Sequence, residues 1–252
     1  MKLDTRKIRA FKKKSSNKAM QMLTCYDYQM AELLNETEID MLLVGDSVGN
    51  VVLGYDHTIQ VELDTMVIFS EAVKRGAPDK FVVADLPFGS YATMEMGLQN
   101  SIKLFQKSKV EALKLEGAFP FICELIERLT QIGIPVMGHI GLTPQSVHEQ
   151  GGYYTHGKDS ASQARLIKES LALEAAGCFS IVLEFVEENL AKEITEKLKI
   201  PTIGIGSGKD CDGQVLVIND LLHNGKKDPP KFCKPIGNVY EFKKKLLTEY
   251  LK

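Results

Sequence analysis

The chain of 252 residues has no tryptophan and no long apolar run, and neither sign of charge predominates. A membrane-spanning helix needs about 18 consecutive apolar residues, so the lack of such a run argues against one. The 31 Lys and Arg against 33 Asp and Glu give a formal net charge of -2. No global basic field is therefore available to bind nucleic acid or an anionic membrane, and a small-molecule partner is favoured.

Cysteine is scarce and is not spaced for a structural role. The five cysteines are odd in number and include no CxxC pair, which argues against a disulfide framework or a structural zinc site. We therefore expect a cytoplasmic location. The 44% hydrophobic and 25% charged residues are close to the averages for globular domains, so the chain can bury a sizeable core.

The first 18 residues carry eight Lys and Arg and a single acid, Asp4. This bias allows two interpretations, a transit peptide or a solvated basic helix that a turn at residues 15–17 follows. The second is favoured because no apolar segment follows and the next residues already resemble a core strand.

Short apolar runs alternate with longer stretches in which apolar residues recur every three or four positions. The short runs predict buried parallel strands at residues 20–24, 41–45, 81–85, 112–116, 135–139, 180–185, 202–205 and 215–218. The longer stretches predict helices at residues 27–34, 63–75, 94–108, 120–131, 160–176 and 187–198. Gly76, Gly133 and Gly177 follow three of these helices, where a left-handed cap is expected.

Eight strands in a chain of this length favour one closed (β/α)₈ barrel over an open doubly wound sheet. We therefore predict an α/β TIM barrel as a single domain over residues 1–252. A short N-terminal helix and a C-terminal helical tail at residues 239–251 are its only additions.

Four carboxylates end four of the predicted strands: Asp46, Asp85, Glu116 and Glu184. Functional groups of such barrels come from the carboxyl ends of strands, so these acids should meet at one rim. Crowded acids need protons or a cation, and hard oxygen ligands without a cysteine or a histidine pair favour Mg²⁺. The alternative is that each acid accepts backbone hydrogen bonds and caps a loop.

Lys114 lies two residues before Glu116, so both side chains should project to the same face of their strand. A cation beside a metal ligand suits an anionic substrate, although a buried structural ion pair is the alternative. His139, which ends another strand, either contacts substrate or is a structural group. Residues 204–208, GIGSG, form either an oxyanion loop or a tight turn.

Several blocks of sequence are more specific. They are LVGDSVGNVVLGYD at residues 43–56, VVADLPFGSY at 82–91, MLTCYDY at 22–28, KLEG at 114–117, MGHIGLTPQS at 137–146 and IGIGSG at 203–208. Together, and in their order along the chain from residue 22 to residue 208, these blocks resemble the ketopantoate hydroxymethyltransferase family. One departure is LEFVE at residues 183–187, where Leu-Glu-Cys-Val-Pro is more familiar.

The resemblance implies a (β/α)₈ barrel that binds Mg²⁺ and assembles as a homo-oligomer, commonly a decamer. The implied reaction of pantothenate biosynthesis transfers a hydroxymethyl group from methylenetetrahydrofolate to 3-methyl-2-oxobutanoate, giving 2-dehydropantoate. The matching positions imply metal binding for Asp46, Asp85 and Glu116, substrate contact for Ser47 and Lys114, and proton abstraction for Glu184. We also expect Asp46, Asp85 and His139 to contact the substrate. Ser47 should face away from the site unless the loop turns there or its backbone N–H is used.

Two other functions stay open. One is a Mg²⁺-dependent lyase or mutase of the isocitrate lyase and phosphoenolpyruvate mutase type, which the blocks around Asp46 and Asp85 match less well. The other is a barrel that binds a keto acid without catalysis, which the intact carboxylates argue against.

Overall fold

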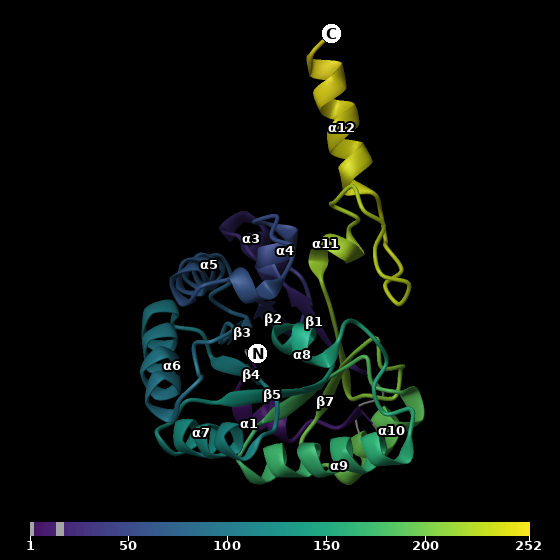
Figure 1. The fold of residues 1–252 in the computed structure, drawn as a ribbon. Coiled ribbons are helices and arrows are strands. Elements are labelled where there is room, and N and C mark those ends of the chain that lie inside the picture. The colour runs from purple at the N-terminus through teal and green to yellow at the C-terminus, as the bar shows by residue number, and fades with distance from the viewer. Residues whose placement is uncertain (1–2, 14–17) are drawn as a thin grey trace. The chain divides into compact units, whose positions relative to one another are not determined.

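The computed structural model describes residues 3–13 and 18–252, and a closed barrel of eight parallel strands in chain order forms its centre (Figure 1). The strands are β1 Met20–Thr24, β2 Met41–Val44, β3 Phe81–Asp85, β4 Ala112–Glu116, β5 Val136–Gly141, β6 Ser180–Glu184, β7 Thr202–Ile205 and β8 Gly213–Leu216. The predicted α/β barrel is confirmed.

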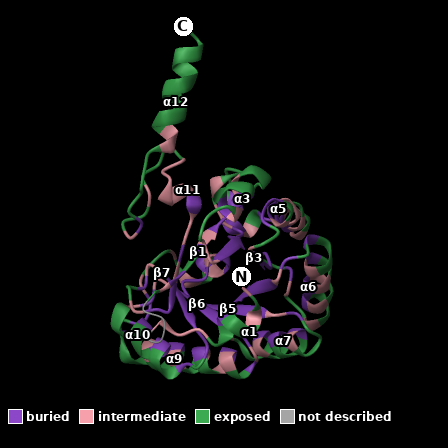
Figure 2. Ribbon diagram, turned by 180° about the vertical axis from the view of Figure 1, so that it is seen from behind, coloured by how far each residue is buried: buried purple, intermediate pink, exposed green. Residues whose placement is uncertain are grey.

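Helices surround the strands, with buried inner faces and exposed outer faces (Figures 1 and 2). They are α3 Tyr28–Asn35, α5 Leu63–Gly76, α6 Met94–Ser108, α7 Pro120–Gln131, α9 Ser160–Ala175 and α10 Glu188–Lys197, all within one residue of the prediction at each end. Periodicity missed five helices of three or four residues, because so few positions show no repeat. These are α4 Val48–Val51, η1 Thr58–Gln60, η2 Pro144–Ser146, α8 Val147–Gln150 and α11 Ile218–Leu221.

The chain divides into two compact units, Met1–Val215 and Leu216–Lys252. The first contains nearly the whole barrel. The second contains α11 and the predicted C-terminal helix, α12 Val239–Tyr250. Among the described residues, no helix is both long enough and apolar enough to cross a membrane. That residues 1–252 behave as one domain stays a prediction.

The last strand corrects the prediction, since β8 is Gly213–Leu216 and residue Ile218 already begins α11. Gly213 pairs with Ile203 of β7. A Cβ at Gly213 would lie 2.6 Å from Ile203 Cδ1 and 2.9 Å from the carbonyl oxygen of Met20, so the barrel closes around a residue without a side chain. Glycine has a low propensity for strands. The apolar run alone therefore predicted a strand that begins and ends two residues too late in the chain.

The glycines that follow helices have two different roles. Gly133 and Gly177 have φ of 94° and 100°, so the predicted left-handed conformation is confirmed at both. It is wrong at Gly76, which is the last residue of α5 and has no positive φ. A Cβ there would lie 2.4 Å from the carbonyl oxygen of Tyr28, so Gly76 instead allows α5 to approach α3 closely.

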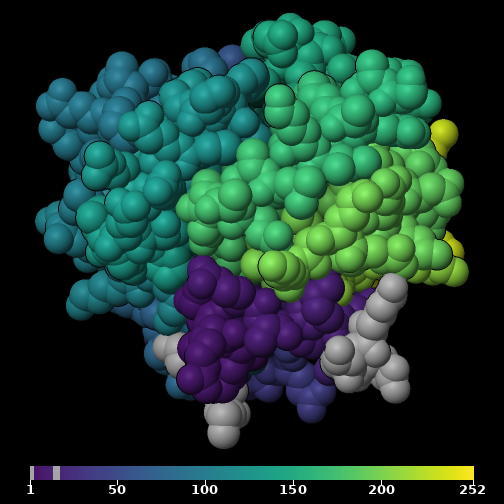
Figure 3. Space-filling model, turned by 90° about the horizontal axis from the view of Figure 1, so that it is seen from below, coloured from purple at the N-terminus to yellow at the C-terminus, as the bar shows by residue number. Residues whose placement is uncertain are grey.

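The basic N-terminal segment contains a helix, α1 Thr5–Arg9, which Asp4 caps by accepting a hydrogen bond from the Lys7 N–H. It is not simply solvated, because Ile8 is fully buried. Seen from below, the segment lies across one face of the molecule (Figure 3). The turn predicted at residues 15–17 lies outside the described residues.

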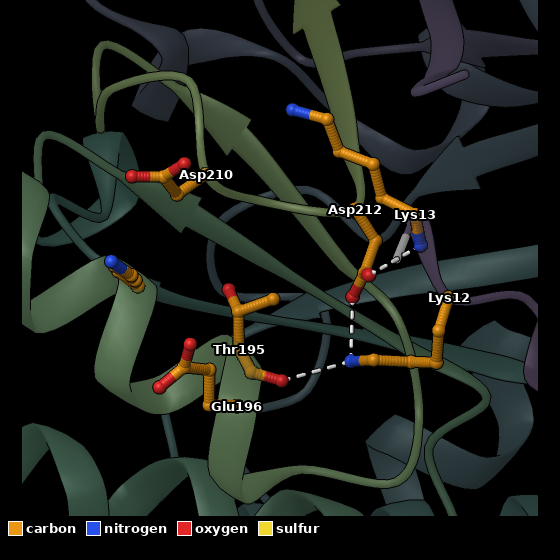
Figure 4. Close-up of a pocket in the computed structure, with 7 residues that line it drawn as sticks. Lys12, Lys13, Thr195, Glu196, Asp210 and Asp212 are labelled. Atoms are coloured by element: carbon orange, nitrogen blue, oxygen red, sulfur yellow. Dashed lines mark hydrogen bonds and ion pairs between the residues drawn. The ribbon is translucent and has the colours of Figure 1, made fainter. Parts of the chain in front are cut away.

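Asp212, 2% exposed, fastens this segment to the amino ends of β7 and β8. One carboxylate oxygen accepts from Lys13 N (2.9 Å), and the other lies 2.6 Å from Lys12 Nζ and accepts from Thr202 N (3.1 Å). Lys12 Nζ also donates to the carbonyl oxygen of Thr195 (2.9 Å; Figure 4). Lys12, Lys13, Thr195 and Asp212 are among the residues that line a cavity of about 440 Å³.

The variant Lys12→Met should lower the free energy of unfolding by about 1–3 kcal/mol, because it removes a charged partner from the buried Asp212 carboxylate. Chemical denaturation measures the loss. Lys192→Met is the matched control, since the exposed Lys192 lines the same cavity. Equal stability of the two variants would contradict the assigned role of Lys12.

Candidate active site

The carboxyl ends of β2 to β6 bring the predicted polar residues to one edge of the barrel. Asp85 and Glu116 are the last residues of β3 and β4, and Glu184 is the last residue of β6. Asp46 lies in the turn after β2. The strand register places Asp85 beside Lys114 and Glu116 beside His139. The expected side chains thus occupy neighbouring strands.

The ammonium group of Lys114 is the hub of this cluster, although its side chain is only 5% exposed. Nζ lies 3.0 Å from Asp85 Oδ1, 3.8 Å from Glu116 Oε1 and 3.1 Å from His139 Nδ1. Burial alone would lower the pKa of Lys114, but the surrounding carboxylates outweigh it and raise the pKa. Lys114 therefore remains a buried cation.

His139 links Glu116 to Glu184, its Nδ1 lying 3.3 Å from Glu116 Oε1 and its Nε2 3.2 Å from Glu184 Oε2. Burial and Lys114 lower the pKa of His139, whereas Glu116 and Glu184 raise it to about 9 overall. If the ring is charged, both nitrogens carry protons. If it is neutral, Nδ1 accepts from Lys114 and Nε2 keeps its proton. A proton therefore sits on Nε2, beside Glu184, in either state.

Asp46 and Asp85 are buried acids with raised pKa values. Burial, and then the charges of Asp85 and Glu116, raise the pKa of Asp46 to about 8. Burial also raises the pKa of Asp85, against the opposing effect of Lys114. Burial would raise the pKa of Glu116 too, but His139 and Lys114 lower it overall. Positive neighbours therefore offset the burial of Glu116 but do not offset the burial of Asp46 and Asp85.

Ser47 reaches the site because the chain turns directly after Asp46, and α4 begins at the next residue. Its Oγ lies 2.8 Å from the hydroxyl of Tyr26, which follows β1 and is 3% exposed. A continued strand would have pointed Ser47 away from the site, and this turn prevents that. A Cβ on Gly45 would lie 2.7 Å from Ser47 Oγ, so the glycine before Asp46 makes room for the hydroxyl.

A cavity of about 290 Å³ adjoins Glu116, between the loops after β4 and β5 and helix α9. Its lining includes Gly117, Phe119, Thr143, Tyr154 and Arg165. The cluster of acids therefore has space for a small molecule on one side.

Comparison with known proteins assigns the chain to a family. The model that describes ketopantoate hydroxymethyltransferase matches residues 2–252. The chain belongs to the ketopantoate hydroxymethyltransferase family. Its similarity is spread over the whole barrel, including every strand end that contributes to the cluster.

Individual relatives agree with this membership. A 3-methyl-2-oxobutanoate hydroxymethyltransferase of Leptospira interrogans is 49% identical over 238 residues, which are 94% of this chain and 90% of the relative. Another of that name, from Thermosipho africanus, is 52% identical over 221 residues, covering 87% and 83% of the two chains. The crystal structure of phosphoenolpyruvate phosphomutase from Streptomyces platensis shares only 11% identity, with a TM-score of 0.65 over 88% of this chain and 83% of that one. That likeness concerns the fold alone.

Gln145 is the residue of this hydroxymethyltransferase site that strand ends could not reveal, because it lies in η2. Its Nε2 donates to Asp46 Oδ2 and to the carbonyl oxygen of Leu86, both at 2.9 Å. Its backbone N donates to Glu116 Oε2 (3.1 Å), and its Oε1 accepts from the hydroxyl of Tyr91. The motif blocks contain both Gln145 and Tyr91, and these blocks were the only signal that could have found them.

We expect Gln145→Glu to lower the free energy of unfolding by about 2–3 kcal/mol, because a carboxylate would replace the donor that faces Asp46 and Leu86. Urea denaturation measures it. Gln131→Glu, on the exposed surface of α7, is the control and should change stability by less than about 0.5 kcal/mol. A Gln145→Glu variant as stable as this control would show that the amide does not hold the acids together.

Proposed function

We propose that this member of the hydroxymethyltransferase family converts 3-methyl-2-oxobutanoate, methylenetetrahydrofolate and water into 2-dehydropantoate and tetrahydrofolate. The observation that carries the proposal is the continuous chain of contacts from Asp46 through Gln145, Glu116 and His139 to Glu184. It places a partly exposed carboxylate beside a buried cluster that is built around a cation. We also propose that the protein is a homo-oligomer. We further propose that it is cytoplasmic, because its five cysteines are free thiols.

Glu184 is the proposed base for the branched carbon of the keto acid. Its side chain is 15% exposed, whereas those of Asp85, Glu116 and His139 are 3% exposed, so it is the most accessible group of the cluster. Removal of the proton leaves an enolate, which attacks the one-carbon unit of the folate. His139 Nε2, which carries a proton, lies 3.2 Å from Glu184 Oε2, and this proximity favours the carboxylate in that place.

Lys114 supplies the positive charge for an anionic substrate. Its ammonium contacts both Asp85 and His139, so it is oriented before substrate arrives. A preorganised charge of this kind stabilises the developing oxyanion without a cost of reorganisation. Ser47, whose hydroxyl Tyr26 orients, is the proposed hydrogen-bonding contact of the same substrate.

The donor set fits a hard divalent cation in part. Asp46 and Asp85 offer carboxylate oxygens, and burial raises the pKa of both, so a cation beside them would offset that burial. Both oxygens of Glu116 already contact protein groups, and among the described residues no three acidic, His or Cys side chains converge as a complete ligand set. Asp46 and Asp85 would hold Mg²⁺ directly, and Glu116 would join them by releasing His139 or Gln145. Bound there, the cation would polarise the keto group and stabilise the enolate.

The proposal is tested by incubating the protein with Mg²⁺, methylenetetrahydrofolate and 3-methyl-2-oxobutanoate and following 2-dehydropantoate by mass spectrometry. We expect product that depends on both substrates. Parallel reactions with isocitrate and with phosphoenolpyruvate test the lyase and mutase alternative. Turnover of either of these, without hydroxymethyl transfer, would overturn the proposal, and binding of the keto acid with no reaction would favour the non-catalytic barrel.

Glu184→Gln should lower kcat for transfer by about 10²- to 10⁴-fold, because the amide cannot accept the proton. Its affinity for 3-methyl-2-oxobutanoate, measured by calorimetry, should stay within about twofold of wild type. Glu187→Gln is the matched control, since Glu187 caps α10 outside the cluster. If Glu184→Gln abolishes binding instead, Glu184 belongs with the groups that hold the cation or the fold.

Asp85→Asn should abolish stabilisation by the divalent cation. In wild type, millimolar Mg²⁺ should raise the midpoint of thermal unfolding, because a ligand that binds only the folded state stabilises it. The variant should show no rise, and Asp64→Asn on the exposed start of α5 should respond like wild type. An unchanged response of Asp85→Asn would remove Asp85 from the proposed ligands.

A further inference from the structure

Phe185, the first residue after β6, has a left-handed backbone with φ of 48°. Among the described residues, the other non-glycine residues with positive φ are Lys109 and His223. Lys109 is the C-cap of α6, and His223 comes just after the cap of α11, where left-handed residues are common. Phe185 directly follows a strand, and a bulky side chain rarely adopts this conformation. The surrounding structure must therefore impose it.

The peptide groups on both sides of Phe185 are held by hydrogen bonds. Phe185 N donates to the carbonyl oxygen of Ile205 in β7 (2.9 Å), and the carbonyl oxygen of Phe185 accepts from His156 N (2.7 Å). Val186 N donates to Ser207 Oγ (2.9 Å), and this hydroxyl donates to the carbonyl oxygen of Leu183 (2.8 Å). Contacts from the segment 204–208 and from His156 thus fix the turn.

The backbone of Glu184 is confined equally closely from β5. Its carbonyl oxygen accepts from Leu142 N (2.8 Å). Gly141 has φ of 95°, and a Cβ there would lie 2.2 Å from the carbonyl oxygen of Glu184. The chain therefore has little freedom at Glu184, and it leaves the barrel wall through the turn at Phe185.

We propose that Phe185 is a positioning residue whose left-handed turn holds the Glu184 carboxylate beside His139. Strained backbone persists at functional sites when the surroundings overdetermine it, and here the strain directly follows the proposed base. The inference rests on the proposed function, because it gives Glu184 a task that depends on its placement. The backbone of Phe185, and not its ring, is what places the Glu184 carboxylate. The Ser207 hydroxyl helps to fix the same turn, so the glycine-rich segment 204–208 acts here as a structural turn.

The experiment follows exchange of the branched-carbon proton of 3-methyl-2-oxobutanoate for deuterium by NMR, with Mg²⁺ and without folate. Phe185→Asn and Phe185→Gly remove the ring but accept the left-handed conformation. Phe185→Val resists it, since its side chain is β-branched. We expect Phe185→Asn and Phe185→Gly to keep kcat within about twofold of wild type. Phe185→Val should lower kcat by about tenfold or more, because displacement of a reacting group is costly, while KM is little changed.

Thermal unfolding and a second site keep the test decisive. Phe185→Asn should unfold at or above the wild-type temperature, because the strain is relieved. If Phe185→Val does not fold, Ser207→Ala replaces it, and its kcat should fall with KM unchanged. The inference is overturned if Phe185→Val, or Ser207→Ala in its place, exchanges at the wild-type rate, or if Phe185→Asn and Phe185→Gly lose as much activity as Phe185→Val. A wild-type protein without exchange overturns the proposed function instead.

Discussion

The buried ammonium of Lys114 is the interaction on which the site depends. It is surrounded by Asp85, Glu116 and His139 on adjacent strands, all nearly inaccessible to solvent. Charges are rarely buried unless they are paired, because desolvation costs several kcal/mol for each ion. The parallel register places Asp85 directly beside Lys114, and so the barrel itself brings opposite charges together. Without the cation, Asp85 and Glu116 would repel each other at the barrel mouth.

The charges of the cluster do not balance evenly. Lys114 and His139 contact Asp85, Glu116 and Glu184, whereas Asp46 is held by the amide of Gln145 and remains close to Asp85. Its pKa of about 8 reflects that environment. Two regions follow from this asymmetry. The side around Asp46 and Asp85 can accept a cation, and the side around His139 and Glu184 can move a proton.

Much of this could be predicted from the sequence because strand ends in a parallel barrel share one edge. Apolar runs that finish in Asp85, Glu116 and Glu184 were enough to predict that these acids meet. Gln145 and Tyr91 could not be found in this way, because they lie outside the strands and act through side-chain geometry. Gly213 and Gly76 were misjudged for a related reason. Their importance lies in close contacts with distant backbone, and local propensity carries no record of such contacts.

The role of the Lys114 ammonium is tested by comparing the unfolding free energies of wild type, Lys114→Met, Asp85→Asn and the double variant. Lys114→Met alone should cost about 3–5 kcal/mol, because it leaves buried carboxylates without their cation. Adding Asp85→Asn should recover part of that loss, so the two changes are not additive. A Lys114→Met variant as stable as wild type, or strictly additive losses, would contradict the claim that this ion pair holds the site together.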